Sequence, residues 1–257
     1  MIDLHAHPLP GVDDGPADVE TALALMEVAA TDGVTVMAAT PHLREDFPLV
    51  RVDHIPARCL ALGAAARRMG VVGPALVPGG EVGVTWATSA TDHELVAASY
   101  GGRGSDLLVE TPHGRLPPGF DEAIFRLAVR GFRILLAHPE RNASLRRTPE
   151  RLAALVRSGV LLQVEARSLL AEADRGRRRL VLELIREELA HVIASDAHSP
   201  GPWRSPSLSV AVRAAEREAG PRVRWMVADA PAAILAGEPL PPGPRPGTGR
   251  LRLRRRS

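Results

Sequence analysis

The 257-residue chain is poor in several residue types, and these shortages argue against particular structures and partners. Its single cysteine, Cys59, excludes an intrachain disulfide and suits a reducing compartment. It contains no lysine, so all 32 basic residues are arginine, and 30 acidic residues bring the net charge to only +2. So small an excess gives no reason to expect a nucleic-acid partner, although the isoelectric point is near 9.4.

Long apolar runs are also missing, since none approaches the ~18 residues that a membrane span needs. The first residues already have the pattern of a strand, which leaves no room for a signal peptide. We therefore expect a soluble, cytoplasmic protein. Aromatic residues make up only 3% of the chain, so alanine, leucine and valine must fill the core that a hydrophobic content of 45% allows.

The most informative segment lies at the amino terminus. His5 and His7 alternate along a short apolar strand and therefore point to the same face. Neutral imidazole is the commonest metal ligand in proteins, and Asp13 and Asp14 follow within the reach of a loop. Alone, this motif is weak, because two polar residues at a strand end would look the same. Its weight comes from six later strand-like runs that also end on polar residues, nearly all of metal-ligand types.

Apolar strand-like runs alternate with amphipathic helical segments, a pattern typical of parallel β/α units. Strands are predicted at residues 2–7, 34–39, 75–78, 107–109, 133–137, 160–164 and 191–195. Helices are predicted at residues 18–30, 52–69, 118–130, 149–158, 168–188, 206–218 and 231–235. The carboxyl ends of the strands form the active face of a β/α barrel, so one site is expected there. We predict one α/β barrel domain over residues 1–236 and a disordered Pro-, Gly- and Arg-rich tail over residues 237–257.

Closing such a barrel would gather nine imidazole and carboxylate side chains around one mouth. They are His5, His7, Asp14, His42, Glu81, Glu110, His138, Asp196 and His198. Nitrogen and oxygen donors without a thiolate suit manganese, iron or zinc. Nine donors exceed the three or four of one catalytic zinc, so two or three ions are expected, with carboxylates such as Glu81 bridging neighbours ~3.5–4 Å apart. Without metal, buried groups this close would repel one another strongly.

The remaining histidines and Asp13 are less clear. Asp13 is either a ligand in place of Asp14 or an acceptor that orients a histidine. The other four histidines lack a strand-end position, and we expect solvent-facing or structural roles for them. These are His54, His93, His113 and His191.

Two arginines lie beside predicted ligands, Arg141 three residues after His138 and Arg204 six residues after His198. A guanidinium group is planar, permanently charged and able to donate two parallel hydrogen bonds, as phosphate binding requires. With 32 arginines in the chain, solvated surface charge is the alternative. That alternative is our interpretation of the arginine-rich runs at residues 175–179 and 250–256.

Taken together, these motifs resemble the PHP (polymerase and histidinol phosphatase) superfamily. The residues that carry the resemblance are His5-x-His7, Asp13-Asp14-Gly15-Pro16, Thr40-Pro41-His42, Gly80-Glu81, His138-Pro139-Glu140-Arg141 and Asp196-x-His198. More narrowly, the chain resembles the bacterial manganese-dependent tyrosine-protein phosphatases of capsule and exopolysaccharide regulation. The resemblance runs from residue 1 to about residue 236, although Leu43 stands where a second histidine often follows Thr-Pro-His.

This resemblance implies a distorted (β/α)7 barrel and a trinuclear metal centre on the nine side chains named above. It also implies that Arg141 and Arg204 bind phosphate, and that the substrate is phosphotyrosine on a cytoplasmic tyrosine kinase. Such a kinase is anchored in the inner membrane, and a weak contact of the basic tail with anionic lipid would suit it.

We therefore predict a manganese-dependent phosphomonoesterase in which water, its pKa lowered by metal, attacks phosphorus in line. The phenolate leaving group needs little acid assistance because the pKa of its conjugate acid is near 10, although His42 or His198 can assist if not fully committed to metal. A Cys-x5-Arg phosphate loop is excluded, because Ala65 stands where the arginine would be. Three alternatives stay open: a small-molecule phosphatase acting, for example, on histidinol phosphate, a phosphodiesterase, and a non-catalytic metal-binding regulator.

Overall fold

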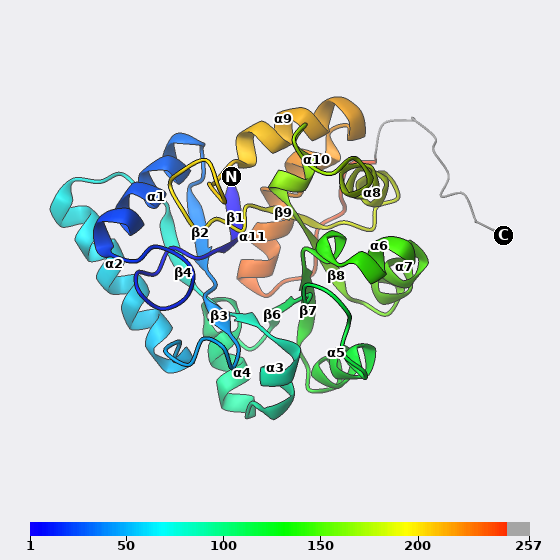
Figure 1. Cartoon of the computed structure of the whole chain (residues 1–257), viewed down its shortest axis with the longest axis horizontal. Helices are drawn as coiled ribbons and strands as arrows, with labels where there is room; N and C mark the ends of the chain where they lie inside the picture. The colour runs from blue at the N-terminus through cyan, green and yellow to red at the C-terminus, as the bar shows by residue number, and fades with distance from the viewer. Residues whose placement is uncertain (246–257) are drawn as a thin grey trace.

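Parallel strands form the centre of the protein in a computed structural model that describes residues 1–245 (Figure 1). The strands are β1 (Ile2–Ala6), β2 (Val36–Ala39), β3 (His42–Leu43), β4 (Ala75–Pro78), β5 (Glu81–Val82), β6 (Asp106–Glu110), β7 (Arg133–Ala137), β8 (Leu161–Glu165) and β9 (Val192–Ala194). They form two sheets, with strand orders β1-β2-β4 and β3-β5-β6-β7-β8-β9. Strands such as β6 and β8 are buried at every residue, as expected of parallel strands covered on both faces.

The two sheets approach one another beyond the end of β9. There Ala6 forms a parallel bridge with Ala197. The amide of His7 donates to the carbonyl of Ala197 at 2.8 Å, and the amide of Asp196 donates to the carbonyl of His5 at 2.9 Å. The end of β1 therefore lies beside the segment that follows β9.

Two of the seven predicted strands are each followed by a second, shorter strand that was not predicted. Pro41 interrupts the run that begins with β2, and Gly79-Gly80 interrupts the run that begins with β4. Proline has no N–H to donate, so the hydrogen-bonded ladder of β2 ends before Pro41. Beyond the two interruptions the chain forms β3 and β5, which pair in the second sheet. There His42 pairs in register with Glu81, which sets two predicted ligands side by side on adjacent strands.

The helices surround the strands (Figure 1). They are α1 (Val19–Thr31), α2 (Ile55–Met69), α3 (Val84–Ser89), α4 (Asp92–Ala98), α5 (Phe120–Val129), α6 (Ala143–Arg147), α7 (Pro149–Arg157), α8 (Arg175–Arg186), α9 (Leu208–Ala219), α10 (Arg222–Trp225) and α11 (Asp229–Ala236). Capping residues in the sequence determine where several of these helices begin or end. Asp18 caps α1 by accepting from the amide of Thr21 at 2.8 Å, and Gly70 ends α2 in the left-handed conformation with φ 69°.

Two helix predictions need correction. The helix expected over residues 168–188 begins only at Arg175, because Asp174 caps it there and accepts from the amide of Arg177 at 2.9 Å. The segment between β5 and β6, for which we predicted no helix, contains α3 and α4. The capping box formed by Thr91 and Glu94 starts the second of these helices.

Alternate residues of the strands enter two apolar clusters. In β7, Ile134 and Leu136 pack with the surrounding helices, whereas Leu135 and Ala137 face an inner cluster. The inner cluster takes residues from six strands and from α11, which contributes Ile234. The same inward alternation sets the polar side chains at the carboxyl ends of the strands around one point.

Helix α11 ends at the predicted domain boundary, but the chain stays in contact with the strands and helices beyond it. The carbonyl of Glu238 accepts from Nη1 of Arg133 at 2.8 Å, Leu240 packs against both apolar clusters, and Gly243 lies against the ring of Trp225. The rest of the predicted tail, residues 246–257, lies outside the described residues. Within residues 1–245, no helix has the length and apolar character needed to span a bilayer.

Candidate metal centre

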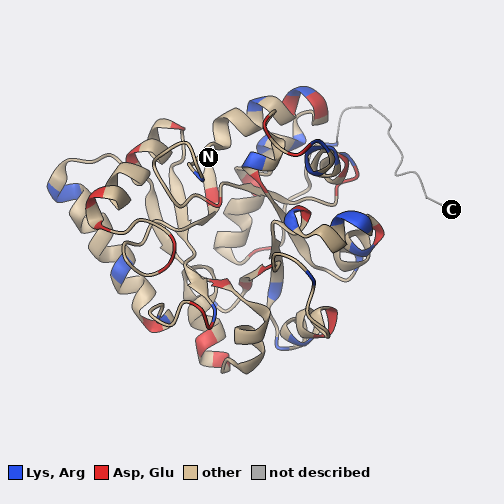
Figure 2. Ribbon diagram, viewed as in Figure 1, with Lys and Arg blue, Asp and Glu red and all other residues tan. Residues whose placement is uncertain are grey.

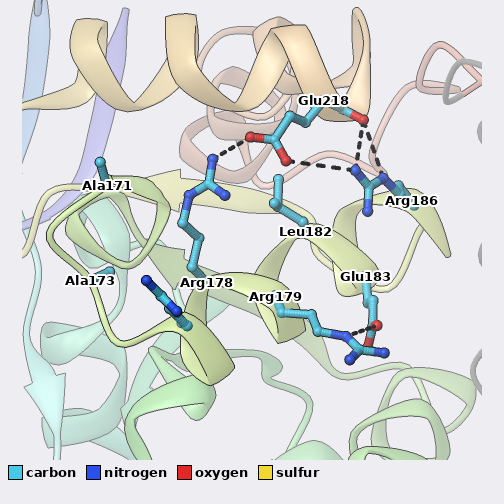
Figure 3. A pocket seen from close by; sticks show the side chains of 9 residues that line it. Ala171, Ala173, Arg178, Arg179, Leu182, Glu183, Arg186 and Glu218 are labelled. Atoms are coloured by element: carbon cyan, nitrogen blue, oxygen red, sulfur yellow. Dashed lines mark hydrogen bonds and ion pairs between the residues drawn. The ribbon is translucent and has the colours of Figure 1, made fainter.

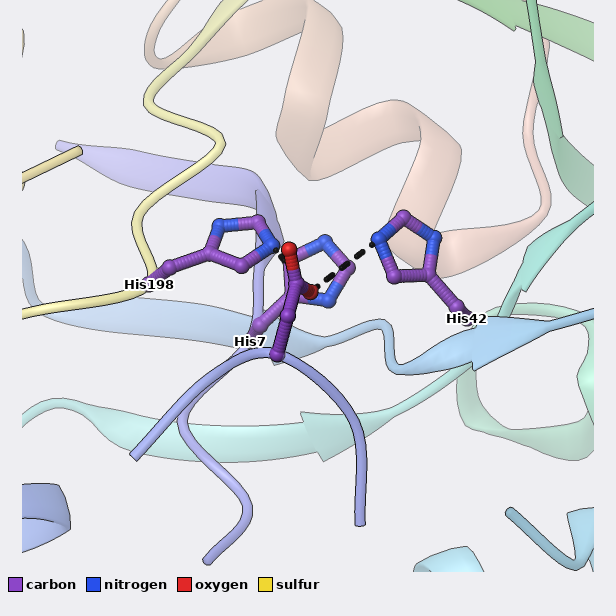
Figure 4. Close-up of side chains that lie close together, drawn as sticks. His7, His42 and His198 are labelled. Carbon is purple, nitrogen blue, oxygen red and sulfur yellow. Dashed lines mark ion pairs between the residues drawn. The ribbon is translucent and has the colours of Figure 1, made fainter. Parts of the chain in front are cut away.

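All nine predicted ligands meet at the carboxyl ends of the strands. Their ligating atoms form four groups, each with atoms within 4.8 Å of one another: His7, Asp14, His42 and His198; His5, His7 and Glu81; His5, His138 and Asp196; and His42, Glu81 and Glu110. Every group shares at least one member with another, so the nine side chains make one continuous cluster. Figure 4 shows the rings of His7, His42 and His198 converging from separate segments. All nine are buried except Asp14, whose side chain is 41% exposed.

Three of the histidines are held by an oxygen acceptor at Nδ1. His5 contacts Oε1 of Gln163 at 3.0 Å, His7 contacts Oδ2 of Asp13 at 2.7 Å, and His198 contacts the backbone carbonyl of Asp196 at 2.8 Å. An acceptor at Nδ1 keeps the ring proton there, so the lone pair is left on Nε2, which faces the cluster. The Nε2 atoms of His5 and His7 lie 3.2 Å apart, as two ligands of one ion would.

Asp13, whose role the sequence left open, belongs to none of the four groups. Besides holding His7, it accepts from the amide of Gly15 at 3.0 Å and from the amide of His42 at 3.2 Å. A Cβ at Gly15 would lie 2.3 Å from the carbonyl oxygen of His7, so only glycine fits this turn. The geometry favours the second predicted role, in which Asp13 orients a histidine and Asp14 faces the cluster.

Glu81 lies at the centre of the cluster. Its Oε1 is 3.0 Å from Nε2 of His138, and its Oε2 is close to three further ring nitrogens: 2.8 Å from Nδ1 of His42, 3.4 Å from Nε2 of His5 and 3.6 Å from Nε2 of His7. Burial alone would raise the pKa of this carboxyl, but the surrounding histidines hold its pKa well below the usual range. Despite these short distances, Oε2 of Glu81 is buried without a hydrogen bond of normal geometry among residues 1–245, and so is Oδ1 of Asp196.

The carboxylates also change the basicity of the histidines. Burial opposes protonation of His5 and His42, yet Glu81 and its neighbouring carboxylates raise the pKa of His5 to about 9 and that of His42 to about 10. Burial and the adjacent His7 lower the pKa of His198 to about 4. The cluster is thus an excess of buried negative charge that favours cations. Orphaned carboxylate oxygens, Nε2 atoms that face inward and the lack of sulfur fit divalent ions of the manganese, iron or zinc type.

Both predicted phosphate-binding arginines reach this cluster. Nη1 of Arg141 donates to Oδ2 of Asp196 at 2.5 Å, and Nη1 of Arg204 donates to Oδ2 of Asp14 at 2.5 Å. Arg204 also contacts Nε2 of His198. Both arginines line a cavity of about 130 Å³ together with five of the nine candidate ligands, namely Asp14, His42, Glu110, His138 and Asp196. A guanidinium group and candidate ligands thus face the same small space.

The backbone is strained at three of these positions. His138, Asp196 and Arg204 have positive φ values of 34°, 53° and 57°. Residues other than glycine rarely adopt this conformation, and where they do the surrounding structure must enforce it. The strain aims these three side chains at the cavity.

Sequence reasoning missed three residues that contact the site. His113, for which we expected a solvent-facing or structural role, lines the cavity with Nε2 3.1 Å from Nη2 of Arg141. Arg44 donates to Glu110 and also pairs with Asp46. Gln163 holds His5. Two of these residues could have been found from the sequence. His113 lies only three residues after Glu110, and Gln163 is the one polar residue in the predicted buried strand at residues 160–164.

The other three histidines agree with their expected roles. His191 is structural, because its Nδ1 accepts from the amide of Leu162 at 3.2 Å, and burial lowers its pKa to about 4. His54 is exposed, as is His93.

Comparison with known proteins agrees with the predicted resemblance. CapC of Staphylococcus aureus is 32% identical over 203 residues, which cover 77% of this chain and 77% of CapC. The tyrosine-protein phosphatase YwqE of Bacillus subtilis is 25% identical over 256 residues, or 95% of this chain and 96% of YwqE. A crystal structure from work on YwqE and on CpsB from Streptococcus pneumoniae, described as unique metal-dependent tyrosine phosphatases, shares the fold. Its TM-score is 0.83 at 24% identity, and the match covers 96% of this chain and 100% of that chain.

The family comparison extends over the whole predicted domain. Residues 1–236 match the family described as capsular polysaccharide synthesis, CpsB/CapC. This range holds all nine clustered ligands and both arginines of the cavity. The chain therefore belongs to the CpsB/CapC family of capsular polysaccharide synthesis proteins.

Proposed function

We propose that the protein is a metal-dependent protein-tyrosine phosphatase acting in the regulation of capsule or exopolysaccharide synthesis. The observation that carries this proposal is the placement of Arg141 and Arg204 on the same small cavity as a continuous cluster of metal-ligand side chains. Relatives support it, because YwqE of Bacillus subtilis and CpsB of Streptococcus agalactiae are named tyrosine-protein phosphatases.

The nine clustered side chains would hold two or three divalent ions, with manganese expected and iron or zinc as alternatives. Such ions supply Lewis-acid stabilisation of phosphoryl oxygens and lower the pKa of water. Four side chains belong to two groups each: His5, His7, His42 and Glu81. Glu81 is the carboxylate among them, and its two oxygens make it the residue best placed to serve two ions.

The residues of the chain then perform three tasks. The guanidinium groups of Arg141 and Arg204 bind the phosphoryl oxygens and stabilise their charge in the transition state. His42 and His198 assist at the leaving oxygen of the phenol if an ion does not fully occupy them. The cavity of about 130 Å³ is so small that it admits the phosphorylated end of a side chain and leaves the rest of a protein substrate outside.

We also propose that the two sheets together make one distorted (β/α)7 barrel. The bridge between Ala6 and Ala197 supports closure on one side, and the continuity of β2 with β3 and of β4 with β5 supports it on the other. The inner apolar cluster, shared by strands of both sheets, is what the interior of such a barrel would contain.

The substrate we propose is a phosphotyrosyl protein, namely a membrane-associated bacterial tyrosine kinase met in the cytoplasm. The alternatives are histidinol phosphate or a similar small phosphomonoester, a phosphodiester, and a regulatory role without catalysis. The family's link to capsular polysaccharide synthesis favours the protein substrate.

A substrate panel tests the proposal. The chelated protein and the manganese-loaded protein are each assayed with p-nitrophenyl phosphate, a phosphotyrosyl peptide, histidinol phosphate and bis-p-nitrophenyl phosphate. We expect no turnover after chelation, recovery that is best with Mn²⁺, and the highest kcat/KM for the phosphotyrosyl peptide. Full activity in metal-free protein would contradict the mechanism, and a preference for histidinol phosphate or the diester would contradict the substrate.

A further inference from the structure

A second depression lies away from the metal centre, between α8, the segment before it and the end of α9 (Figure 3). We call it the α8 groove; its volume is about 860 Å³. Its charged lining residues are Arg175, Arg178, Arg179, Glu183, Arg186 and Glu218. From the sequence we interpreted the arginine-rich run at residues 175–179 only as solvated surface charge. In the structure these side chains instead surround one hollow.

The arginines outnumber the carboxylates in the groove by four to two. Arg186 has a structural role, because its Nε and Nη2 donate to the backbone carbonyl of Glu218 at 3.2 and 3.0 Å and join α8 to the end of α9. Arg178 contacts the Glu218 carboxylate, and Arg179 pairs with Glu183 at 2.9 Å one turn along the helix. Arg175 and Arg179 stand at the exposed rim of the groove. Figure 2 marks the basic residues of α8 in blue on the ribbon.

The position of these arginines within the helix is unfavourable for the isolated protein. Arg175 is the first residue of α8, two more arginines of the groove follow within the next four positions, and the first turn holds no acidic residue. The amino terminus of a helix carries partial positive charge, which favours anions and disfavours cations. The carboxylate of Asp174 at the N-cap offsets part of this repulsion, and a bound anionic partner would offset more of it.

Contacts connect the groove to the candidate active site. Nε of Arg178 donates to the carbonyl of Leu169 at 3.1 Å, and Leu169 closes the turn that follows β8. Arg167 in the same turn lies 5.5 Å from the ring of Trp203, which is 75% exposed. The next residue, Arg204, lines the cavity of the metal centre. These contacts place Arg167 and the exposed Trp203 between the cavity and the groove, where a polypeptide bound in both could pass.

We propose that the α8 groove binds an acidic segment of the phosphotyrosyl protein that the enzyme dephosphorylates. This inference rests on the proposed function and adds a preference for substrates with glutamate or aspartate at a distance from the phosphotyrosine. The carboxyl-terminal tail of the chain does not suit the groove, because residues 239–257 contain six arginines and no acid. A bilayer suits it less than a peptide does, because Arg178 and Arg186 are recessed, with side chains 29% and 20% exposed.

The test compares charge reversal in the groove with charge reversal elsewhere. The groove variant is Arg175→Glu with Arg179→Glu, and the control is Arg67→Glu with Arg68→Glu, two exposed arginines in the last turn of α2. Acidic residues are favourable at the start of a helix, so the groove variant should fold, which a thermal melt checks. Each protein, loaded with manganese, is assayed on p-nitrophenyl phosphate and on two phosphotyrosyl peptides that differ only in having four flanking glutamates or four flanking glutamines.

For the wild type and the control we expect kcat/KM about tenfold higher on the glutamate peptide at low salt, through a lower KM. The advantage should fall as salt rises. The groove variant should lose it while its turnover of p-nitrophenyl phosphate stays unchanged. Fluorescence anisotropy with the unphosphorylated glutamate peptide should show the same loss of binding.

Each other result has a distinct meaning. If p-nitrophenyl phosphate is hydrolysed but the wild type treats the two peptides alike, the groove inference is wrong and the proposed function stands. If no aryl phosphate is hydrolysed by manganese-loaded protein, the proposed function fails, and the anisotropy measurement still decides whether the groove binds acidic peptide. If the groove variant loses only binding to phosphatidylglycerol vesicles, the surface contacts membrane and the inference is overturned.

Discussion

Oδ2 of Asp13 lies 2.7 Å from Nδ1 of His7, and the same carboxylate also accepts from the amides of Gly15 and His42. One side chain thus fixes the ring orientation of one candidate ligand and the backbone of another. Burial would raise the pKa of Asp13, but His7 and the amide of Gly15 hold its pKa below the usual value, so it stays an anionic acceptor at neutral pH.

Asp13→Ala should therefore weaken manganese binding although no proposed ligand is lost. Loss of a residue that orients a metal-bound histidine typically costs about 10–100-fold in affinity. Metal titration of the chelated protein measures this. Asp18→Ala is the control, because it removes the cap of α1, lowers thermal stability and should leave metal affinity unchanged. Equal affinities for the two variants would show that Asp13 does not orient His7.

Glu81→Ala should lower activity more than Ala at a ligand that belongs to a single group, such as Glu110. Glu81 is shared by two groups, so its loss disturbs two ions at once. We expect a fall of at least ~10³-fold in kcat, or roughly 4 kcal/mol of barrier. The measurement pairs kcat with metal content. A fall below about tenfold with metal content unchanged would place Glu81 outside the ligand set.

Arg141→Lys and Arg204→Lys keep the positive charge but remove the planar fork that matches phosphate. Activity on the phosphotyrosyl peptide should fall, and inhibition by inorganic phosphate should weaken, while metal content stays the same. Arg126→Lys is a matched control on the exposed face of α5, where the arginine pairs with Glu122 one turn away. If both site variants behave like this control, neither arginine binds phosphate.

Truncation after Arg245 tests the proposed contact of the basic tail with anionic membrane. The cut removes residues 246–257 and keeps the segment that packs on both apolar clusters through Leu240. Turnover of a small aryl phosphate should not change. Binding to anionic vesicles should weaken, since each basic residue near such a surface contributes about 1 kcal/mol, and the binding of the full chain should decrease with salt. If the full-length protein does not bind the anionic vesicles at low salt, the proposed membrane contact is wrong.

The clustering of the candidate ligands was predictable because most of them are chemically distinctive residues at the end of an apolar run. Glu110 directly follows the predicted strand at residues 107–109, and His138 directly follows the one at 133–137, so no tertiary information was needed to select them. The alternation of strands and helices was predictable for the same reason, because the change in period is local.

The contacts of Gln163 and His113 were not predictable in this way. Gln163 matters only because β8 lies near enough to β1 for its amide to reach His5, and that proximity is a property of the assembled fold. His113 lies in a loop whose course depends on Asn142, which donates to the carbonyls of Pro112 and Gly114. The ends of two predicted strands before Pro41 and Gly79-Gly80 were visible in the sequence. The short strands that follow and set His42 beside Glu81 were not, because they depend on pairing in the assembled sheet.

The inner apolar cluster also bears on the order of events in a catalytic cycle. It fills the space behind the metal centre, and Ile234 of α11 packs into it. If the two sheets close into the proposed barrel, this cluster blocks passage through that end, and the substrate and its products use the same opening. Under the proposed function, the dephosphorylated tyrosine then leaves first and inorganic phosphate leaves last.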